Sequence, residues 1–263
     1  MDYRQTDELS IENLCVDFDT PEGIVHAVRD VSLKVHKGRI TALVGESGSG
    51  KSVTSLAVMS LLARNGSINN GKIICNGTDL LALSVKERHA LNGRTFGMIF
   101  QDPGAALDPL FTVEQQMTEG LREHQRISRQ EARELSIRYL KAVNLQEPES
   151  LLKKRPFELS GGMCQRVMIA MTMALQPDYL IADEPTTALD VTVQKQILRQ
   201  IYQLCREQEI GILFITHDLG VVAEIADEVA IMQAGQIVEN GDVLQIFEHP
   251  QHAYTKQLLN AVL

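Results

Sequence analysis

The chain has 263 residues, 44% of them hydrophobic and 22% charged, which is an ordinary globular composition. Its formal net charge of -9 argues against a basic surface for nucleic acid, and no apolar run reaches the roughly 18 residues that a membrane helix requires. The polar N-terminus does not resemble a secretory signal, and the four cysteines lack metal-ligand spacing, so we expect a cytoplasmic protein with reduced thiols.

The first third of the sequence predicts strands around one helix. Residues 9–19 and 27–38 alternate between apolar and polar side chains, as strands with one buried face do. Residues 39–45 form a short apolar run that ends in glycine, which is typical of a buried strand. A helical pattern follows at 51–62, and residues 71–80 predict a strand and a turn.

The middle of the chain, from about Val85 to Leu175, is mostly helical in pattern, with helices expected at 84–92, 113–125, 129–143 and 163–176. Beyond Pro177 the sequence predicts strands at 179–184 and 211–218, helices at 191–208 and 219–226, and a strand pair at 228–241. Because alternating strands and helices build a parallel sheet, we expect an α/β core of residues 1–84 and 176–263. A helical subdomain, residues 85–175, is inserted into it.

Residues 45–52, GESGSGKS, match the phosphate-binding pattern G-x-x-x-x-G-K-[ST] between a predicted strand and a predicted helix. Backbone N–H groups of such a loop, with the positive end of the helix dipole, surround phosphate oxygens. Lys51 would reach the β- and γ-phosphates, and Ser52 would bind Mg²⁺. The alternative is a Gly/Ser-rich surface turn, which leaves the strand and helix around it unexplained.

Two adjacent carboxylates, Asp183 and Glu184, end the predicted strand at 179–184. Asp183 can hold Mg²⁺ through its water, and Glu184 can polarise an attacking water as a general base. Such a pair is common where a strand meets a solvated loop. In a chain that also has a phosphate-binding loop, it predicts nucleotide hydrolysis.

Two further polar residues follow predicted strands, His217 after ILFIT and Gln101 after GMIF. Ligands of parallel sheets bind beyond the carboxyl ends of the strands, so we expect His217 near the γ-phosphate. A structural histidine and a simple loop glutamine are the alternatives. A second glycine-serine segment, LSGGMCQR at 159–166, begins an apolar helix and has no lysine. Its alternative is a flexible helix start that Ser160 caps.

In this order the motifs resemble those of the ATP-binding subunit of an ABC transporter, over nearly the whole chain. The resemblance implies one nucleotide-binding domain over residues 1–263, with a RecA-like P-loop core, an antiparallel β subdomain and the inserted α-helical subdomain. It implies an ATPase that uses ATP and Mg²⁺ to power import through a membrane transporter. The implied ATP-binding residues are Gly45, Glu46, Ser47, Gly48, Ser49, Gly50, Lys51, Ser52, Val53 and Gln101, together with Phe18 against the adenine, where a core phenylalanine is the alternative.

The same resemblance assigns the remaining roles. Mg²⁺ would be held by Ser52, Gln101 and Asp183, and the catalytic residues would be Glu184 and His217. In the family two subunits pack head to tail, so the signature motif contacts the partner's ATP and the partner supplies the lysine. The implied signature residues are Ser160, Gly161, Gly162, Met163 and Gln165; many relatives have glutamine at the position of Met163. TALD at 187–190 resembles the D-loop, with Asp190 as its functional residue.

Several stretches resemble the oligopeptide, dipeptide and nickel import branch, including MIFQDP, ALDPLFTV and HPQHAYTKQLL. That branch implies a paralogous second ATPase subunit, with a homodimer as the alternative, on two transmembrane permease subunits. An extracytoplasmic substrate-binding protein delivers the cargo, and this subunit would lie peripherally on the cytoplasmic face of the inner membrane. No cysteine-rich tail follows Leu263, which favours nickel or metal chelates, or a truncated peptide importer. HPQH lacks a third metal ligand, so a solvated helix cap is expected there.

Two other classes of function compete with transport. The first is an ATP-driven machine of DNA repair or translation, but those proteins usually carry coiled-coil inserts or two cassettes, and this acidic chain has neither feature. The second is a nucleotide sensor or scaffold, which Glu184 and His217 argue against. We therefore expect no nucleic-acid partner.

Overall fold

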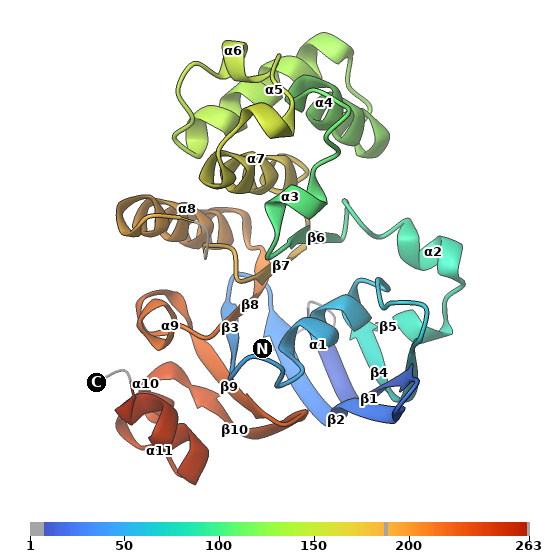
Figure 1. The fold of residues 1–263 in the computed structure, drawn as a ribbon, viewed down its shortest axis with the longest axis vertical. Coiled ribbons are helices and arrows are strands. Elements are labelled where there is room, and N and C mark those ends of the chain that lie inside the picture. The colour runs from blue at the N-terminus through green and yellow to red at the C-terminus, as the bar shows by residue number, and fades with distance from the viewer. Residues whose placement is uncertain (1–7, 187–188, 262–263) are drawn as a thin grey trace, which may run out of the picture. The chain divides into compact units, whose positions relative to one another are not determined.

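The structure is a computed structural model that describes residues 8–186 and 189–261 (Figure 1). Its contacts divide the chain into two compact units. Unit 1 comprises residues 1–91 and 205–263, and unit 2 comprises residues 92–204. The division groups two strands with the helices of unit 2, whereas the sequence placed the helical subdomain at 85–175.

An antiparallel sheet in unit 1 has the strand order β2-β1-β4-β5. Its strands are β1 (Glu8–Thr20), β2 (Gly23–His36), β4 (Gly66–Cys75) and β5 (Thr78–Asp79). The register between β1 and β4 shifts after Glu12, and Gly71 lies opposite this bulge with φ +103°. The strand predicted to start at Gly71 therefore begins five residues earlier, because this glycine marks a bulge within the strand and not its boundary.

A second sheet region of unit 1 carries the buried strand β3 (Ile40–Val44). It pairs in parallel with β8 (Gly211–Thr216) and β9 (Glu228–Gln233), and β9 pairs antiparallel with β10 (Gln236–Asp242). All residues of β3 and β8 are buried, and for β3 this was predicted from its apolar run.

The helices of unit 1 include three that pack against β3 and β9. Residues of α9 (Leu219–Ile225), α10 (Val243–Glu248) and α11 (Ala253–Asn260) join Val44 and Ile231 in one hydrophobic cluster. Unit 1 also contains α1 (Lys51–Val58), η1 (Leu80–Ala82) and α2 (Val85–His89). Helix α1 ends four residues before the predicted Leu62, because Ser60 adopts a left-handed backbone, φ +57°.

Unit 2 contains the parallel strands β6 (Phe96–Ile99) and β7 (Tyr179–Asp183). Capping boxes begin two of its helices, pairing Thr112 with Gln115 and Ser128 with Glu131. Helix α8 starts in unit 2 and ends in unit 1. The helices are α3 (Pro103–Ala106), α4 (Val113–His124), α5 (Arg129–Ala142), α6 (Pro148–Leu151), η2 (Pro156–Glu158), α7 (Gly161–Ala174) and α8 (Val191–Gln208).

Candidate functional site

The phosphate-binding loop, residues 45–52, follows β3 and ends in the first two residues of α1, so strand and helix flank it as the sequence predicted. At two of its glycines a side chain would clash with neighbouring backbone. A Cβ at Gly45 would lie 2.1 Å from the carbonyl oxygen of Met232. Gly50 has φ +106°, and a Cβ there would lie 2.5 Å from the Ala27 carbonyl oxygen. Neighbouring backbone therefore packs directly against this loop and fixes its path.

Lys51 is 6% exposed and folds back over the loop. Its Nζ donates to the carbonyl oxygens of Gly45, at 2.7 Å, and Glu46, at 2.8 Å. Gly50 is the N-cap of α1, and no side chain caps that helix. No side chain occupies the first N–H groups of α1, so these donors can bind an anion, and the positive charge of Lys51 lies beside them.

His217 lies at the same sheet edge as the loop. Val44 of β3 pairs in parallel with Thr216 of β8, so the residues that follow, Gly45 and His217, both leave the carboxyl ends of these strands. His217 is exposed, and the next residue, Asp218, caps α9 by accepting from the Gly220 N–H at 2.8 Å. The predicted parallel arrangement of these two strands is confirmed.

In unit 2 the ends of β6 and β7 bring Gln101 and Glu184 together. Ile99 pairs with Ala182, and beyond this pair Gln101 Nε2 donates to Glu184 Oε2 at 3.1 Å. Asp183 is 5% exposed, and Glu184 is half-buried. Glu184 has φ +46°, a left-handed backbone that is strained for a residue with a side chain. Such a conformation persists only where surrounding contacts hold it.

The signature segment begins α7 as a capped helix. Ser160 is its N-cap, and the Ser160 Oγ accepts from the Met163 N–H at 3.3 Å. Ser160 and Gly161 are exposed, while Gly162 and Met163 are half-buried. The exposed Ser160 and Gly161 can therefore contact another molecule, and the serine cap is present without one.

Gln165 differs from the rest of the signature segment because it is completely buried. Its Nε2 donates to the carbonyl oxygen of Pro185 at 2.7 Å, next to Glu184 in the chain. The adjacent Arg166 donates to the Asn144 carbonyl oxygen at 3.0 Å. Burial lowers the pKa of Arg166, and the charge of Asp190 opposes that shift. Helix α7 thus contacts the chain segment that carries the acidic residues.

Three other predicted features are placed as follows. The ring of Phe18 is half-buried and lies against Gly66, where a Cβ would come within 2.7 Å of its Cε1. In the TALD segment, residues 187 and 188 lie outside the described residues, while Asp190 caps α8 by accepting from the Val193 N–H at 3.0 Å. His252 is the N-cap of α11, which confirms the expected cap. Within residues 8–186 and 189–261, no cluster of three or more His, Cys, Asp or Glu is placed to hold a metal.

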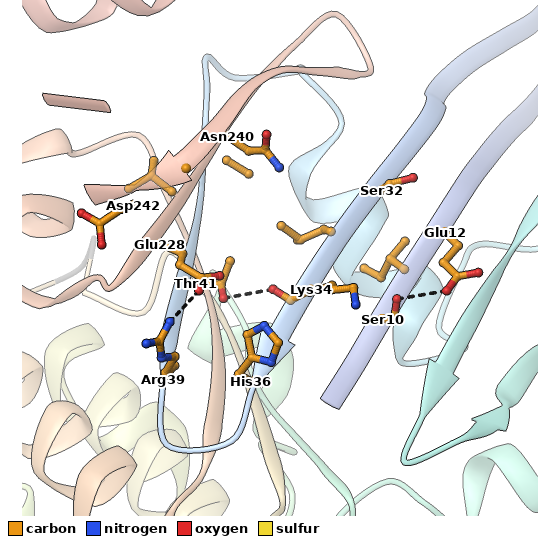
Figure 2. A pocket seen from close by; sticks show the side chains of 15 residues that line it. Ser10, Glu12, Ser32, Lys34, His36, Arg39, Thr41, Glu228, Asn240 and Asp242 are labelled. Carbon is orange, nitrogen blue, oxygen red and sulfur yellow. Dashed lines mark hydrogen bonds and ion pairs between the residues drawn. The ribbon is translucent and has the colours of Figure 1, made fainter. Parts of the chain in front are cut away.

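A cavity of about 580 Å³ in unit 1 contains none of the predicted site residues. Charged and polar side chains of β1, β2, β3, β9 and β10 line it, and Arg39 pairs with Glu228 across 2.8 Å (Figure 2). This ion pair and the hydrogen bond from Ser10 to Glu12 use part of the lining charge internally. The candidate chemistry therefore lies at the strand ends and not in this cavity.

Sequence comparisons match residues 28–187 to the family model described as ABC transporter. The oligopeptide transport ATP-binding protein OppD of Bacillus subtilis is 49% identical over 257 residues, which cover 97% of this chain and 72% of that protein. The dipeptide transport ATP-binding protein DppD of the same organism is 48% identical, covering 97% and 76%. The glutathione import ATP-binding protein GsiA of Escherichia coli K12 is 47% identical, covering 97% and 42%.

Among solved structures, the dimeric ATP-binding cassette MJ0796, in a post-hydrolysis state with ADP and Pi, superposes with a TM-score of 0.82. It is 26% identical and covers 89% of this chain and 98% of that one. Together with the sheets and helices described above, this similarity confirms the predicted fold, a RecA-like P-loop core with an antiparallel β subdomain and an inserted α-helical subdomain.

Proposed function

The chain belongs to the ABC transporter family and is one of its ATPases, and we propose that it powers the import of peptides. The proposal of ATP hydrolysis rests on two residues at the ends of β6 and β7, Gln101 and Glu184, where the Gln101 amide donates to the Glu184 carboxylate. The cargo part rests on the relatives, whose names refer to oligopeptides, dipeptides and glutathione.

The loop at 45–52, with Val53, binds the ATP phosphates in this proposal. Its glycines let backbone N–H groups face the phosphate oxygens, and the uncapped α1 N-terminus adds its partial positive charge. Lys51 exchanges its bonds to the Gly45 and Glu46 carbonyls for bonds to the phosphates. Phe18 contacts the adenine in this proposal, as the family resemblance implies.

The donor residues that the family resemblance implies are suited to Mg²⁺. The Asp183 carboxylate, the Gln101 amide oxygen and the Ser52 hydroxyl are hard oxygen ligands, which this ion prefers. When bound, the ion would neutralise negative charge on the phosphate oxygens. Asp183 is almost fully buried, so its carboxylate is held in one place, while Gln101 keeps its amide near Glu184.

Glu184 polarises the attacking water in this proposal. A general base must be oriented before it can act, and the hydrogen bond from Gln101 fixes one carboxylate oxygen. His217, exposed at the carboxyl end of β8, contributes a polar group toward the γ-phosphate.

The exposed signature residues Ser160 and Gly161, with Gly162 and Met163, serve the ATP of a second subunit. They stand at the N-terminus of α7, where backbone N–H groups and the dipole favour negative charge. Gln165 has a different role, because burial keeps it from any partner and its amide supports the Pro185 carbonyl. Asp190 is the D-loop residue of the proposed site, and it caps the start of α8.

We propose the following organisation and partners. Residues 1–84 and 176–263 form the core, and residues 85–175 form the helical subdomain. A second ATPase subunit completes two ATP sites, two permease subunits form the path through the membrane, and a binding protein delivers cargo. The chain acts peripherally on the cytoplasmic face of the inner membrane. Among the described residues, none of the helices has the length and apolar character that crossing a bilayer requires.

Uptake measurements test the function. The complex that co-purifies with the tagged chain is reconstituted with its binding protein in vesicles, and uptake of labelled di- and oligopeptides is compared with uptake of a nickel chelate. We expect peptide uptake that requires ATP and disappears in the Glu184→Gln complex. ATP-dependent nickel uptake without peptide uptake would refute the cargo proposal, and co-purification of no membrane protein would refute the transport proposal.

A further inference from the structure

The C-terminal helix α11 makes a direct hydrogen bond to the phosphate-binding loop. The backbone N–H of Glu46 donates to the hydroxyl oxygen of Tyr254 at 3.1 Å, although the two residues are 208 positions apart in the sequence. Neither the relatives nor the motifs assign this tyrosine a role. Its hydroxyl oxygen accepts from the second residue of the phosphate-binding loop.

The tyrosine ring is held firmly where this bond forms. Tyr254 is 5% exposed and belongs to the cluster that contains Val44, the last residue of β3 before the loop, and Ile231 of β9. In Figure 1, α10 and α11 lie together beside β10. A fixed ring places the hydroxyl group in a fixed position relative to the start of the loop.

The start of α11 is itself anchored to β10 by Glu239. Its carboxylate accepts from the Gln251 N–H at 2.7 Å and from the His252 N–H at 3.0 Å. The Nδ1 of His252 then accepts from the Tyr254 N–H at 3.2 Å. A continuous series of hydrogen bonds therefore runs from β10 through Glu239, His252 and Tyr254 to the loop.

One peptide unit receives support from two sides. The Gly45 carbonyl accepts from Lys51 Nζ at 2.7 Å, and the N–H of the same peptide, that of Glu46, donates to Tyr254. If Lys51 turns toward bound phosphates, it leaves this carbonyl. The bond to Tyr254 is then the one of these two side-chain supports that still fixes the peptide.

We propose that Tyr254 is a positioning residue for ATP binding, and that α11 is thereby part of the nucleotide-binding apparatus of unit 1. The inference rests on the proposed function of the loop at residues 45–52. The coupling is reciprocal, because a contact that favours nucleotide binding must itself be favoured by bound nucleotide. Nucleotide should therefore hold α11 more tightly on the cluster.

Tyr254→Phe tests the hydroxyl alone, since phenylalanine keeps the ring in its cluster. The matched control is Tyr139→Phe. Tyr139 is 9% exposed in unit 2, and its hydroxyl oxygen accepts one hydrogen bond, from Gln176 Nε2 at 3.2 Å. Nucleotide affinity is measured by calorimetry with ADP and with a non-hydrolysable ATP analogue. The thermal midpoint of each nucleotide-free chain is measured alongside.

We expect Tyr254→Phe to weaken nucleotide binding about 2- to 12-fold, the range that one hydrogen bond supplies. Tyr139→Phe should bind nucleotide like the wild type, with a thermal midpoint lowered at least as much. Unchanged affinity in Tyr254→Phe would overturn the inference, and so would an equal loss in both variants, because that loss would reflect general destabilisation.

Hydrogen exchange supplies a readout that a purely structural tyrosine would not alter. In the wild type, nucleotide should slow exchange of the α11 amides, and in Tyr254→Phe this protection should be smaller. If nucleotide did not change the exchange rate of the α11 amides in the wild type, the inference would be wrong even though the loop bound ATP. If Lys51→Ala bound nucleotide as tightly as the wild type, the proposed function of the loop would fail instead.

Discussion

Replacing Gln165 with leucine tests whether the signature helix holds the catalytic segment. The change keeps the approximate volume of the side chain and removes the bond from Nε2 to the Pro185 carbonyl. It also removes Gln165 Oε1, a buried oxygen without a hydrogen-bond partner among the described residues. Loss of the bond from Nε2 destabilises the fold, but removal of the buried Oε1 partly compensates for it, so the variant should still fold.

Gln165→Leu should disturb the segment at Glu184 and Pro185 more than it lowers the stability of the whole chain. The buried Pro185 carbonyl loses its donor, which costs about 1–3 kcal/mol. Glu184 precedes it with φ +46°, a left-handed backbone that costs roughly 1–2 kcal/mol. Because the two quantities are similar, the loop can relax once the bond is gone, and the aligned carboxylate becomes rarer. A loss of 1–3 kcal/mol corresponds to a fall in kcat of about 5- to 150-fold.

Steady-state ATP hydrolysis by the assembled complex measures this effect. The KM for ATP should change less than about 2-fold, because the hydrogen bond that Gln165→Leu removes goes to Pro185, which is not a residue of the phosphate-binding loop. The control is Gln125→Leu, which removes a similar bond, from Gln125 Nε2 to the Ala174 carbonyl at 3.1 Å. A wild-type kcat in Gln165→Leu, or an equal loss in both variants, would show that the bond from Gln165 to Pro185 does not hold the Glu184 carboxylate in place.

Three further outcomes are expected. Glu184→Gln should keep ATP binding while hydrolysis falls roughly 10²- to 10⁴-fold, the usual cost of losing a general base; single-turnover hydrolysis at the wild-type rate would contradict this. Gln101→Ala should reduce transport more than ATP affinity, which paired uptake and binding assays can show; a collapse of affinity with hydrolysis still coupled would contradict it. Although burial raises the pKa of Glu239, the nearby Thr255 side chain and the hydrogen bonds from the Gln251 and His252 N–H groups lower it below 4.5 overall. Its contribution to stability is therefore present above pH 4.5 and lost as pH falls through the lower folded value, so Glu239→Ala should flatten the acid limb of a thermal-midpoint titration.

The parts of the site that depend on short stretches of chain were predictable from the sequence. The strand, loop and helix around Lys51 follow from a local pattern, and so does the serine cap at the start of α7. The parallel arrangement of β3 and β8 was expected from the alternation of strands and helices, and their pairing at Val44 and Thr216 brings the loop and His217 to one edge. In these cases local sequence and fold class agree.

Other features depended on contacts between distant segments. Gln165 was assigned to the partner's ATP because it follows the signature glycines, yet it shares a face of α7 with Met168, Ile169 and Thr172, all buried. Helical periodicity could therefore have predicted its burial, but not its acceptor at Pro185. The bond between Tyr254 and Glu46 spans 208 positions, and no local pattern indicates which loop a helical tyrosine will meet.

Two double variants test whether Ser160 and Lys51 of one chain serve two different ATP molecules. Ser160→Arg is combined either with replacement of the loop lysine in the partner ATPase or with Lys51→Ala in this chain. The complex with the partner change should hydrolyse ATP about as well as the weaker single variant, since both changes affect one site. The complex with Lys51→Ala should have no activity, because each ATP site carries one change. Equal residual activity in the two double variants would show that Ser160 does not serve the ATP bound by the partner's phosphate-binding loop.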